Sequence, residues 1–448
     1  MSTDTQTIAG WGRYPRRVTR LIPVREEAAV APLHRAETGL IARGNGRAYG
    51  DAALGDTTTL ALGGLDRMIA FDPETGHLAV EAGVLLADII DAFLPRGFFP
   101  AVVPGTRYVT VGGAIAADVH GKNHHGAGGF GAHVENLTLA LPDGAVRTCG
   151  PDANADLFAA TLGGMGLTGT ILRATLRLRR VETGWIRQRT VAAADLDAAM
   201  QALEAANGST YAVAWIDCLA RGAARGRALV YRGEHATRAD VADLAPDAPL
   251  NPPAGGGALA VPLDLPAFTL NRLSVGAFNA LYYGRGRAGG NRETLVGWAP
   301  YFFPLDGIRD WNRIYGARGF LQHQCVIPKA RSRAALAEIL DRVAHAAPSF
   351  LAVLKLLGPG GGVMSFPLEG YTLTLDFPAS PANLALLDSL DTIVRAAGGR
   401  LYLAKDARQS RDTFEAGYGD AAARFRALRR DLGATDRIAS GLSRRLAL

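Results

Sequence analysis

Three of the nine histidines in this chain lie in one glycine-rich segment, residues 104–131. The segment reads PGTRYVTVGGAIAADVHGKNHHGAGGFG and holds eight glycines. Glycine has no side chain and tolerates positive φ, so backbone N–H groups in such a run can close around an anion such as a phosphate. The segment therefore predicts a ligand-binding site.

The spacing of His120 and His124 is that of two zinc ligands on a helix. Gly121, Asn123 and the glycines that follow argue against a helix there, and no nearby Cys or Glu completes a ligand set. We therefore expect no metal. For His124 and His125, a loop role bonded to the backbone and a functional role both stay open.

A second set of polar residues lies in strand-like segments of the C-terminal half of the chain. Gln322, Gln324 and Lys355 alternate with apolar neighbours, which places them on one face of a sheet. A polar sheet face suggests a sugar-binding surface. Lys122 and Lys355 are compact cations that can hold a phosphate.

The elements that must position these residues begin with a strand near 39–42 and the first glycine loop of the chain, RGNGRAYGDAAL, at 43–54; residues 104–131 form the second glycine loop. A Rossmann fingerprint needs a helix directly after its glycines, and the β-prone TTTLALGG follows here, so that interpretation fails. A hairpin at 68–83 and a helix at 84–97, with Leu85, Ile89, Ile90 and Phe93 on one face, come next.

Further strands are predicted at 134–149 around a Pro-Asp-Gly turn, and a third glycine loop precedes a long strand that ends near Val181. From about Thr183 helices alternate with strands, so a second domain starts there. Residues 244–300 are rich in Pro and Gly and too long for a simple connector, which suggests a mobile cover over a site. Strands recur at 320–328, 350–358 and 371–378.

Length and composition fit an enzyme of two domains: 448 residues, 48% hydrophobic and 20% charged. No apolar run is long enough to span a bilayer, and the N-terminus lacks an apolar signal region, so we expect a cytoplasmic protein. Cys149, Cys218 and Cys325 are odd in number and far apart, which argues against disulfides. The net charge of +6 is spread along the chain, which disfavours nucleic acid but allows an anionic substrate or membrane surface.

Several motifs together resemble one family, the decaprenylphosphoryl-β-D-ribose 2-oxidases, which are FAD-dependent oxidoreductases of the vanillyl-alcohol-oxidase or PCMH type. The resemblance runs in order over nearly the whole chain, and HGKNHH and LYLAKD are its most specific parts. It implies an α+β fold with a PCMH-type FAD-binding domain of two α+β subdomains at 1–182. It also implies a substrate domain with a central antiparallel sheet at 183–399 and a C-terminal segment, 400–448, that returns to the FAD domain.

The resemblance also assigns cofactor contacts. The implied FAD-binding residues are Ala42, Arg43, Gly44, Asn45, Gly46, Arg47, Ala48, Tyr49, Gly50, Asp51, Ala52, Gly105, Thr110, Val111, Gly112, Gly113, Ala117, Asp118, Val119, His120, Ile171 and Tyr402. Related flavoenzymes often tether FAD to a histidine in the first glycine loop, where this chain has Arg47. Arginine cannot form that bond, so we expect non-covalent FAD.

For catalysis, Lys405 is expected at the polar edge of the flavin, where its ammonium stabilises the negative charge of the reduced ring. A solvated surface lysine is the alternative interpretation. Tyr49, His120 and Lys405 are the candidate bases, and the sequence does not rank them. The predicted substrate-binding residues are Lys122, Trp215, Tyr301, Gln322, Gln324, Lys355, Thr372 and Thr374.

Some of these assignments compete with simpler ones. Trp215 and Tyr301 are predicted pocket walls, although core packing is the commoner use of an aromatic residue. Tyr49 is a candidate for holding sugar hydroxyls or for packing. Thr372 and Thr374 stand where the best-known members of the family carry Asn and Cys, which leaves the reaction class intact and puts the identity of the substrate in doubt.

The implied reaction is oxidation of the 2-hydroxyl of a polyprenylphosphoryl pentose to a 2-keto sugar, the first half of an epimerisation toward arabinose donors for cell-envelope glycans. A short-chain NAD(P)H-dependent reductase is the implied partner. Residues 268–303 interleave aromatic and apolar residues with arginines, so peripheral contact with the inner membrane and a flexible loop are both open. A soluble alditol or sugar-lactone oxidase using oxygen is the rival function, and a catalytically silent FAD-binding protein is a second rival.

Overall fold

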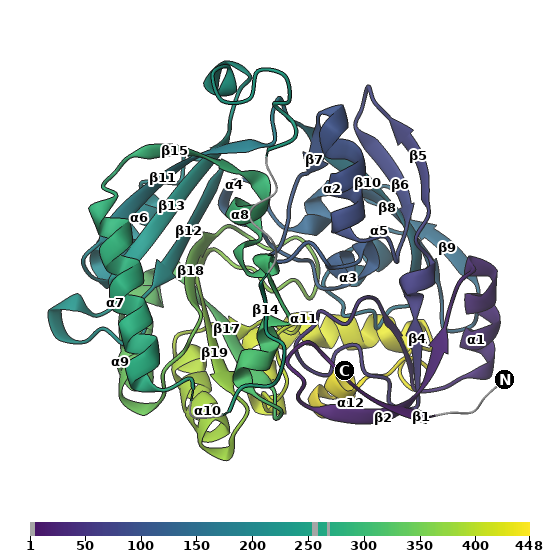
Figure 1. Cartoon of the computed structure of the whole chain (residues 1–448). Coiled ribbons are helices and arrows are strands. Elements are labelled where there is room, and N and C mark those ends of the chain that lie inside the picture. The colour runs from purple at the N-terminus through teal and green to yellow at the C-terminus, as the bar shows by residue number, and fades with distance from the viewer. Residues whose placement is uncertain (1–4, 253–258, 267–268) are drawn as a thin grey trace.

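The computed structural model describes residues 5–252, 259–266 and 269–448. Two regions lie side by side in Figure 1, one purple to blue and one teal to green, and the yellow C-terminal residues lie against both. The first region contains two sheets. The smaller has the order β1-β2-β4-β3, in which β4 is parallel to both neighbours. Its strands are β1 (Thr5–Ala9), β2 (Arg16–Pro23), β3 (Leu40–Arg43) and β4 (Thr58–Ala61), and helix α1 (Val30–Ala36) connects β2 to β3.

The larger sheet of this region has six strands, most of them in the order β5-β6-β10-β8-β9, with β7 paired to β10. The strands are β5 (Met68–Asp72), β6 (His77–Glu81), β7 (Phe98–Pro100), β8 (Val134–Ala140), β9 (Val146–Cys149) and β10 (Thr170–Arg180). The helices are α2 (Leu86–Phe93), α3 (Val111–Ala116), α4 (His124–Ala127) and α5 (Ala155–Thr161). The predicted hairpin and the predicted α+β order are confirmed.

Two local predictions were wrong. Leu85 precedes helix α2 as its N-cap and forms a β-bridge with Thr110, because its backbone N–H bonds to the Asp88 carboxylate and its φ and ψ are extended. Residues 124–127 form a one-turn helix, α4, despite the surrounding glycines. The turn closes when the N–H of Ala127 donates to the carbonyl of Asn123.

The second region is built on an eight-stranded sheet in the order β15-β11-β13-β12-β18-β19-β17-β20, antiparallel throughout. Its strands are β11 (Trp185–Ala193), β12 (Tyr211–Ile216), β13 (Ala228–His235), β15 (Glu293–Gly297), β17 (Phe320–Pro328), β18 (Ala352–Leu357), β19 (Gly370–Pro378) and β20 (Arg400–Leu401). Helices α6 (Leu196–Glu204), α9 (Lys329–Ala346) and α10 (Pro381–Ala396) pack on one face. Alternate strand residues such as Leu373 and Leu375 enter that core, so their neighbours must face the other way.

The opposite face of this sheet is partly covered by the segment predicted to be a cover. Its helices are α7 (Arg272–Ala288) and α8 (Trp298–Phe302), and β14 (Leu259–Ala260) pairs in parallel with β16 (Ile308–Arg309). Residues 253–258 and 267–268 of the predicted cover lie outside the described residues. The mobility of the cover stays a prediction.

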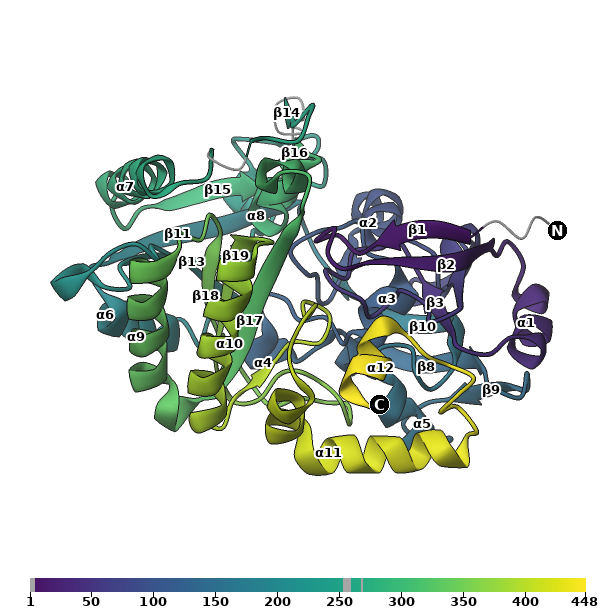
Figure 2. The ribbon, with the colours of Figure 1, turned by 90° about the horizontal axis from the view of Figure 1, so that it is seen from below.

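After β20 the chain leaves the large sheet and reaches the first region again. Helix α11 (Arg411–Asp431) contacts α5, and α12 (Gly441–Leu446) contacts α11, as the yellow ribbons of Figure 2 show. Ile438 forms a bridge with Leu40, and Ser440 with Gly55. The division at residues 182 and 399 stays a prediction. None of the helices in the described ranges has the length and apolar character that crossing a membrane requires.

Candidate active site

Three segments far apart in the sequence meet where the two regions join. The first glycine loop contacts the second at Gly44, where an added Cβ would lie 2.1 Å from Thr110 Oγ1. Asn45 Nδ2 donates to the carbonyl of Tyr108 at 2.8 Å. The N–H of Tyr49 donates to the carbonyl of Ala404 at 2.9 Å. The predicted FAD-binding residues of 42–52 and 105–120 are therefore brought together, with the LYLAKD turn beside them.

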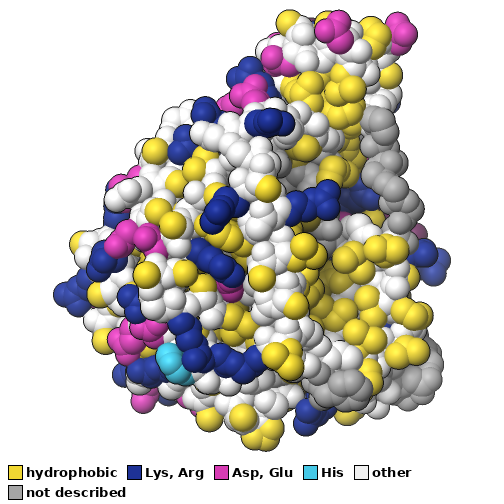
Figure 3. Space-filling model, turned by 60° about the vertical axis from the view of Figure 1, so that its left-hand side comes forward, with side chains coloured by type: hydrophobic (Ala, Val, Ile, Leu, Met, Phe, Trp, Pro, Cys, Tyr) yellow, Lys and Arg dark blue, Asp and Glu magenta, His cyan; other side chains and the backbone are white. Residues whose placement is uncertain are grey.

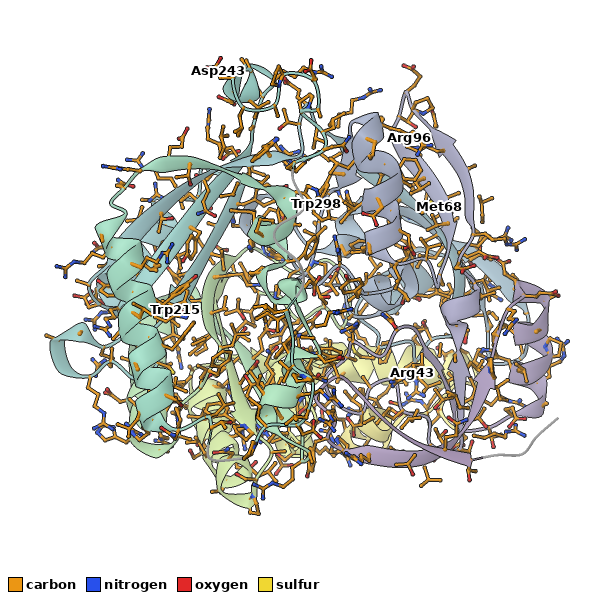
Figure 4. The ribbon with its side chains drawn as sticks, in the orientation of Figure 1. Arg43, Met68, Arg96, Trp215, Asp243 and Trp298 are labelled. Carbon is orange, nitrogen blue, oxygen red and sulfur yellow. The ribbon has the colours of Figure 1, made fainter. Side chains whose placement is uncertain are left out.

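The backbone of these loops suits a large flat cofactor. Gly46 has φ of +63°, which a side chain would strain, and an added Cβ at Gly105 would meet no atom within 4 Å, so the chain borders open space there. Thr110 Oγ1 accepts from the N–H of Gly113 at 3.2 Å and fixes the start of α3. Figure 4 labels Arg43, beside the first loop, and Trp215, near α7, on opposite sides of the junction.

The predicted cofactor residues differ in exposure. One group is exposed or half-buried and can offer backbone to a ligand; it consists of Ala42, Arg43, Gly44, Asn45, Gly46, Arg47, Ala48, Gly105, Gly112, Gly113 and Ala117. The rest are buried: Tyr49, Gly50, Asp51, Ala52, Thr110, Val111, Asp118, Val119, His120, Ile171 and Tyr402. The buried Val111 and Ile171 belong to an apolar core, so they also support the loops from behind.

Asp118 holds the loop that carries the histidines. Its backbone has φ of +38°, and its buried carboxylate accepts from the N–H of Gly131 at 2.9 Å and from Ser365 Oγ at 2.5 Å. Burial raises the pKa of this carboxyl, while the bonds from Ser365 and Gly131 lower it. Asp118 thus accepts hydrogen bonds from both regions, and the bond from Ser365 connects the histidine loop to the second region.

His120 is buried between the rings of Tyr402, at 5.1 Å, and Phe366, at 5.5 Å. The amide of Gln324 lies 2.9 Å from its Nε2, so a neutral ring carries its proton on Nδ1. Burial, followed by the charge of Lys355, holds the pKa of His120 well below its ordinary value. Within the described residues Nδ1 has no partner. An unpaired buried donor of this kind points to a bound ligand.

The other two histidines of the motif bond to the backbone. His124 Nδ1 accepts from the N–H of Gly358 at 3.1 Å, and His125 Nε2 lies 2.9 Å from the carbonyl of Ser209. Among the described residues, no three His, Cys, Asp or Glu side chains are grouped as metal ligands. These contacts support the loop role for His124 and His125.

A polar face lies across the junction from His120. In the sheet register Gln322 is opposite Asp376, Gln324 opposite Thr374, and Lys355 opposite Thr372, so all six share one face. Gln322 Nε2 donates to Asp376 Oδ1 at 2.5 Å, and Gln324 Nε2 donates to Thr372 Oγ1 at 3.2 Å. The predicted residues Gln322, Gln324, Lys355, Thr372 and Thr374 are therefore together on the open face of the sheet.

Asp376 is a buried carboxylate that the sequence reasoning missed. Burial raises its pKa to about 7, while the bond from Gln322 and the charge of Lys405 lower it. Tyr315 Oη donates to its Oδ2 at 3.4 Å. The signal was present in the sequence, because the alternation that pairs Thr372 with Thr374 continues two residues further.

Lys405 is enclosed by the groups around it. Its Nζ lies 3.5 Å from the centre of the Tyr49 ring. Burial lowers its pKa to about 7, while Asp376 raises it and Lys355 lowers it further. Burial raises the pKa of Tyr49 well above its ordinary value, so its phenol keeps its proton at neutral pH. Lys405 is not the freely solvated surface lysine of the alternative interpretation.

Two more lysines lie close by without a carboxylate. Lys122 Nζ donates to the carbonyl of Tyr301 and lies 4.5 Å from the centre of that ring. Burial, with Lys355 nearby, lowers the pKa of Lys122 to about 7, and burial alone lowers that of Lys355 to about 8. Neither forms an ion pair within the described residues. Trp215 packs at 4.8 Å on Tyr282 of α7, further along the same sheet face.

Comparisons with known proteins show the family of this chain. Residues 26–150 match the model of the family described as FAD binding domain. The chain is 37% identical to decaprenylphosphoryl-β-D-ribose oxidase of Mycolicibacterium smegmatis over 100% of this chain and 98% of that protein. An uncharacterised protein of Streptomyces coelicolor is 38% identical over 82% of this chain and 100% of its own length. L-Gulonolactone oxidase of Mus musculus is 32% identical over only 34% of each chain.

Proposed function

The chain belongs to the family of decaprenylphosphoryl-β-D-ribose oxidases, and we propose that it oxidises the 2-hydroxyl of a polyprenylphosphoryl pentose to the 2-keto sugar. It is an FAD-dependent oxidoreductase. In the proposed reaction C2 loses a hydride and the 2-hydroxyl loses a proton. The product is the first intermediate of an epimerisation toward arabinose donors.

The observation that carries this proposal is the pair of cations Lys122 and Lys355. Two half-buried ammonium groups that lack a carboxylate in the described part of the chain lose hydration, and a bound anion would offset that cost. A phosphodiester between lipid and sugar supplies that anion. A free alditol or lactone does not, and the lactone oxidase relative matches only a third of the chain.

The polar sheet face supports binding of the sugar itself. The amides of Gln322 and Gln324 and the hydroxyls of Thr372 and Thr374 offer neutral donors and acceptors to hydroxyl groups. His120 meets this face through its Nε2, which lies 2.9 Å from the amide of Gln324, and its Nδ1 lacks a partner in the described residues. Together these groups can orient a pentose against the loops that hold the cofactor.

FAD fits the backbone of the converging loops, with Lys405 at its polar edge. When bound, FAD accepts the hydride that leaves C2. Of the three candidate bases, Tyr49 keeps its proton and His120 binds protons too weakly, because burial shifts both pKa values away from neutrality. Lys405, with a pKa near 7, takes the hydroxyl proton in its neutral form, and the resulting ammonium stabilises negative charge beside it.

The decisive experiment is anaerobic mixing of the holoenzyme with polyprenylphosphoryl ribose, free ribose or a free alditol. We expect bleaching of the flavin absorbance with the lipid-linked sugar alone. Lys122→Met and Lys355→Met should raise the KM for it, whereas Lys329→Met should not, because Lys329 is half exposed and paired with Glu204 at 3.3 Å. Equal bleaching by free alditols would favour the oxygen-dependent sugar oxidase instead.

We propose further that FAD is held without a covalent bond. Arg47 stands where a tethering histidine would be, and its guanidinium stacks on Trp11, with 4.0 Å from Cζ to the ring centre. Acid precipitation should leave the flavin in the supernatant. A yellow protein pellet would contradict this expectation.

The exposed face of α7 supports peripheral contact with an anionic membrane. The side chain of Leu273 is 85% exposed and that of Leu281 is 73% exposed. The two residues are eight positions apart in α7. The helix contains Arg272, Arg285 and Arg287 but no acidic residue. Figure 3 shows this side of the molecule, where hydrophobic side chains gather beside lysines and arginines. A lipid-linked substrate would be delivered at such a surface.

Vesicle sedimentation tests this contact. The full chain should sediment with vesicles of phosphatidylglycerol and phosphatidylcholine, and Leu273→Glu with Leu281→Glu should abolish sedimentation. Val146→Glu, a matched change at a residue 54% exposed in the other region, should have no effect. Failure of the unmodified chain to sediment would reject the proposed contact.

The proposed product also defines a partner class. A 2-keto sugar becomes an epimer only when its carbonyl is reduced from the opposite face. We therefore propose a nicotinamide-dependent short-chain reductase as the consumer of the product. Coupled conversion of the ribose donor to the arabinose donor in the presence of such a reductase would support it, and accumulation of the ketone would count against it.

A further inference from the structure

We infer that Arg445, three residues from the C-terminus, is a positioning residue that clamps the turn carrying Lys405 onto the first glycine loop. Within the described residues, the side-chain hydrogen bonds and ion pairs of Arg445 go to Asp51, Asp406 and Gln409 rather than to the predicted sugar-binding face or Lys405. Arg445 acts through two aspartates, one on each side of the contact between turn and loop. The inference deepens the proposed function and rests on the role given there to Lys405.

The clamp consists of charge-assisted hydrogen bonds from one guanidinium. Arg445 Nη2 donates to Asp51 Oδ1 at 2.8 Å, and its Nη1 donates to Asp406 Oδ2 and to the carbonyl of Gln409, both at 2.8 Å. The Arg445 side chain is 22% exposed, whereas those of Asp51 and Asp406 are 6% and 2% exposed. A planar guanidinium offers separate nitrogens in a fixed geometry to the two carboxylates, whereas an ammonium offers a single nitrogen.

The two aspartates lie in the segments that must stay together. Asp51 follows Tyr49 by two residues in the glycine loop, and Asp406 follows Lys405 directly. Between them the backbones touch, because an added Cβ at Gly50 would lie 1.9 Å from the carbonyl oxygen of Asp406. A shift of the turn relative to the loop would therefore move the Lys405 ammonium away from the Tyr49 ring.

Electrostatics explains why an arginine is needed at this place. Burial raises the pKa of Asp51, and burial would also raise that of Asp406 if Arg445 and two backbone N–H groups did not hold it below its ordinary value. Without the guanidinium, two enclosed carboxylates would repel each other across the contact. The turn and the loop would then move apart, or one of the two carboxylates would take up a proton.

Helix α12 has other anchors, so loss of the guanidinium need not unfold it. Leu442 and Leu446 are fully buried, and the Ser440 side chain caps the helix by accepting from the N–H of Ser443. The neighbouring Arg444 points to a different partner, Asp56, at 3.0 Å. Arg444→Gln is therefore a matched control on the same helix.

The test compares Arg445→Gln with Arg444→Gln by three readouts. These are the Kd of the apoprotein for FAD, amide hydrogen exchange of residues 46–52 and 402–409, and the pH profile of flavin reduction. We expect Arg445→Gln to weaken FAD binding about tenfold or more, to speed exchange in both segments and to shift the pH midpoint. Arg444→Gln should leave all three unchanged.

A conservative variant keeps the test decisive if Arg445→Gln does not fold. Arg445→Lys retains the charge but replaces the separate guanidinium nitrogens by one, so it should show the same changes at a smaller size. Unchanged FAD affinity, exchange and pH midpoint in either folded variant would overturn the inference. A loss of thermal stability with an unshifted pH midpoint would also overturn it, because that pattern marks a merely structural residue.

These readouts separate this inference from the proposed function. FAD affinity and amide exchange require no sugar substrate, so they remain informative if polyprenylphosphoryl ribose fails to reduce the flavin. Conversely, the clamp can fail its test while the substrate assignment stands.

Discussion

At the residue scale, the proposed chemistry depends on three lysines whose pKa values are lowered: Lys405, Lys122 and Lys355. The charge of Asp376 raises the pKa of Lys405, whereas Lys122 and Lys355 have no carboxylate partner among the described residues. Burial is the main cause in all three cases, because an ammonium loses hydration there. The first lysine is thus suited to proton transfer and the other two to an anionic ligand.

Replacing Lys405 tests the first role. In Lys405→Met the ammonium is lost while the side-chain volume is nearly kept, so we expect FAD to remain bound and the rate of flavin reduction to fall about 100-fold or more. Anaerobic stopped-flow absorbance measures that rate, with Lys329→Met as control. Full turnover by a flavin-loaded Lys405→Met protein would exclude the assignment.

The other two lysines predict a pH dependence of substrate binding. A phosphodiester keeps one negative charge through this range, whereas Lys122 and Lys355 lose their protons as pH rises through about 7 and about 8. Affinity should therefore be highest below pH 7 and fall by on the order of tenfold per unit above pH 8. The KM measured from pH 6 to 9 checks whether affinity falls as pH rises. Lys355→Met should weaken the pH dependence of KM at the upper end of this range. An increase of affinity with pH would contradict the anion site.

At the scale of elements, the site depends on a sheet face and on close approach of loops. Period-two alternation in β17, β18 and β19 sends Leu373 and its equivalents into the helix-covered core and leaves Thr372, Gln324 and Lys355 on the open face. The loops approach through glycines, because at Gly44 and Gly50 a side chain would collide with the facing segment.

Gly50→Ala tests this close approach. Its Cβ would lie 1.9 Å from the carbonyl oxygen of Asp406, so the turn must move, and we expect a loss of about 1–3 kcal/mol in unfolding free energy together with weaker FAD binding. Thermal unfolding and FAD titration measure both. Gly63→Ala is the control, because an added Cβ there meets nothing within 4 Å. Equal behaviour of the two variants would show that the turn and loop tolerate separation.

At the scale of the whole molecule, one apolar core joins residues from both ends of the chain. Leu40 and Ile41 pack in it with Val326 from the large sheet and with Ile438 and Leu446 from the last segment. The C-terminal segment therefore supports the first glycine loop as part of that core. Stability of the cofactor site should depend on the last residues of the chain.

Truncation after residue 433 tests this dependence. The shortened chain loses Ile438, α12 and the Arg445 contacts, so we expect it to retain little FAD and to unfold at lower temperature. Flavin content after purification and differential scanning calorimetry measure these effects. Full FAD content in the truncated protein would show that residues 434–448 are not needed to support the first glycine loop.

The sequence by itself determined the local features of this protein. Glycine spacing, apolar alternation and the specific motifs predicted the α+β class, the FAD-binding family and the shared face of Gln322, Gln324 and Lys355. The α+β class and the shared sheet face depend on neighbours in the chain, so periodicity records them directly, whereas the family came from the resemblance of whole motifs. The same alternation extended to Asp376, although the sequence reasoning stopped at Thr374.

Only the tertiary structure decided which distant groups meet and how their charges respond. The contact of Lys405 with Tyr49, the pairing of His120 with Gln324 and the bond from Arg445 to Asp51 each join residues separated by more than 200 positions. No local pattern encodes such contacts, and a pKa depends on the burial and the neighbouring charges that the folded chain creates. Burial in the folded chain lowers the pKa of Lys122, Lys355 and Lys405, and this supports the proposed proton acceptor and the proposed anion site.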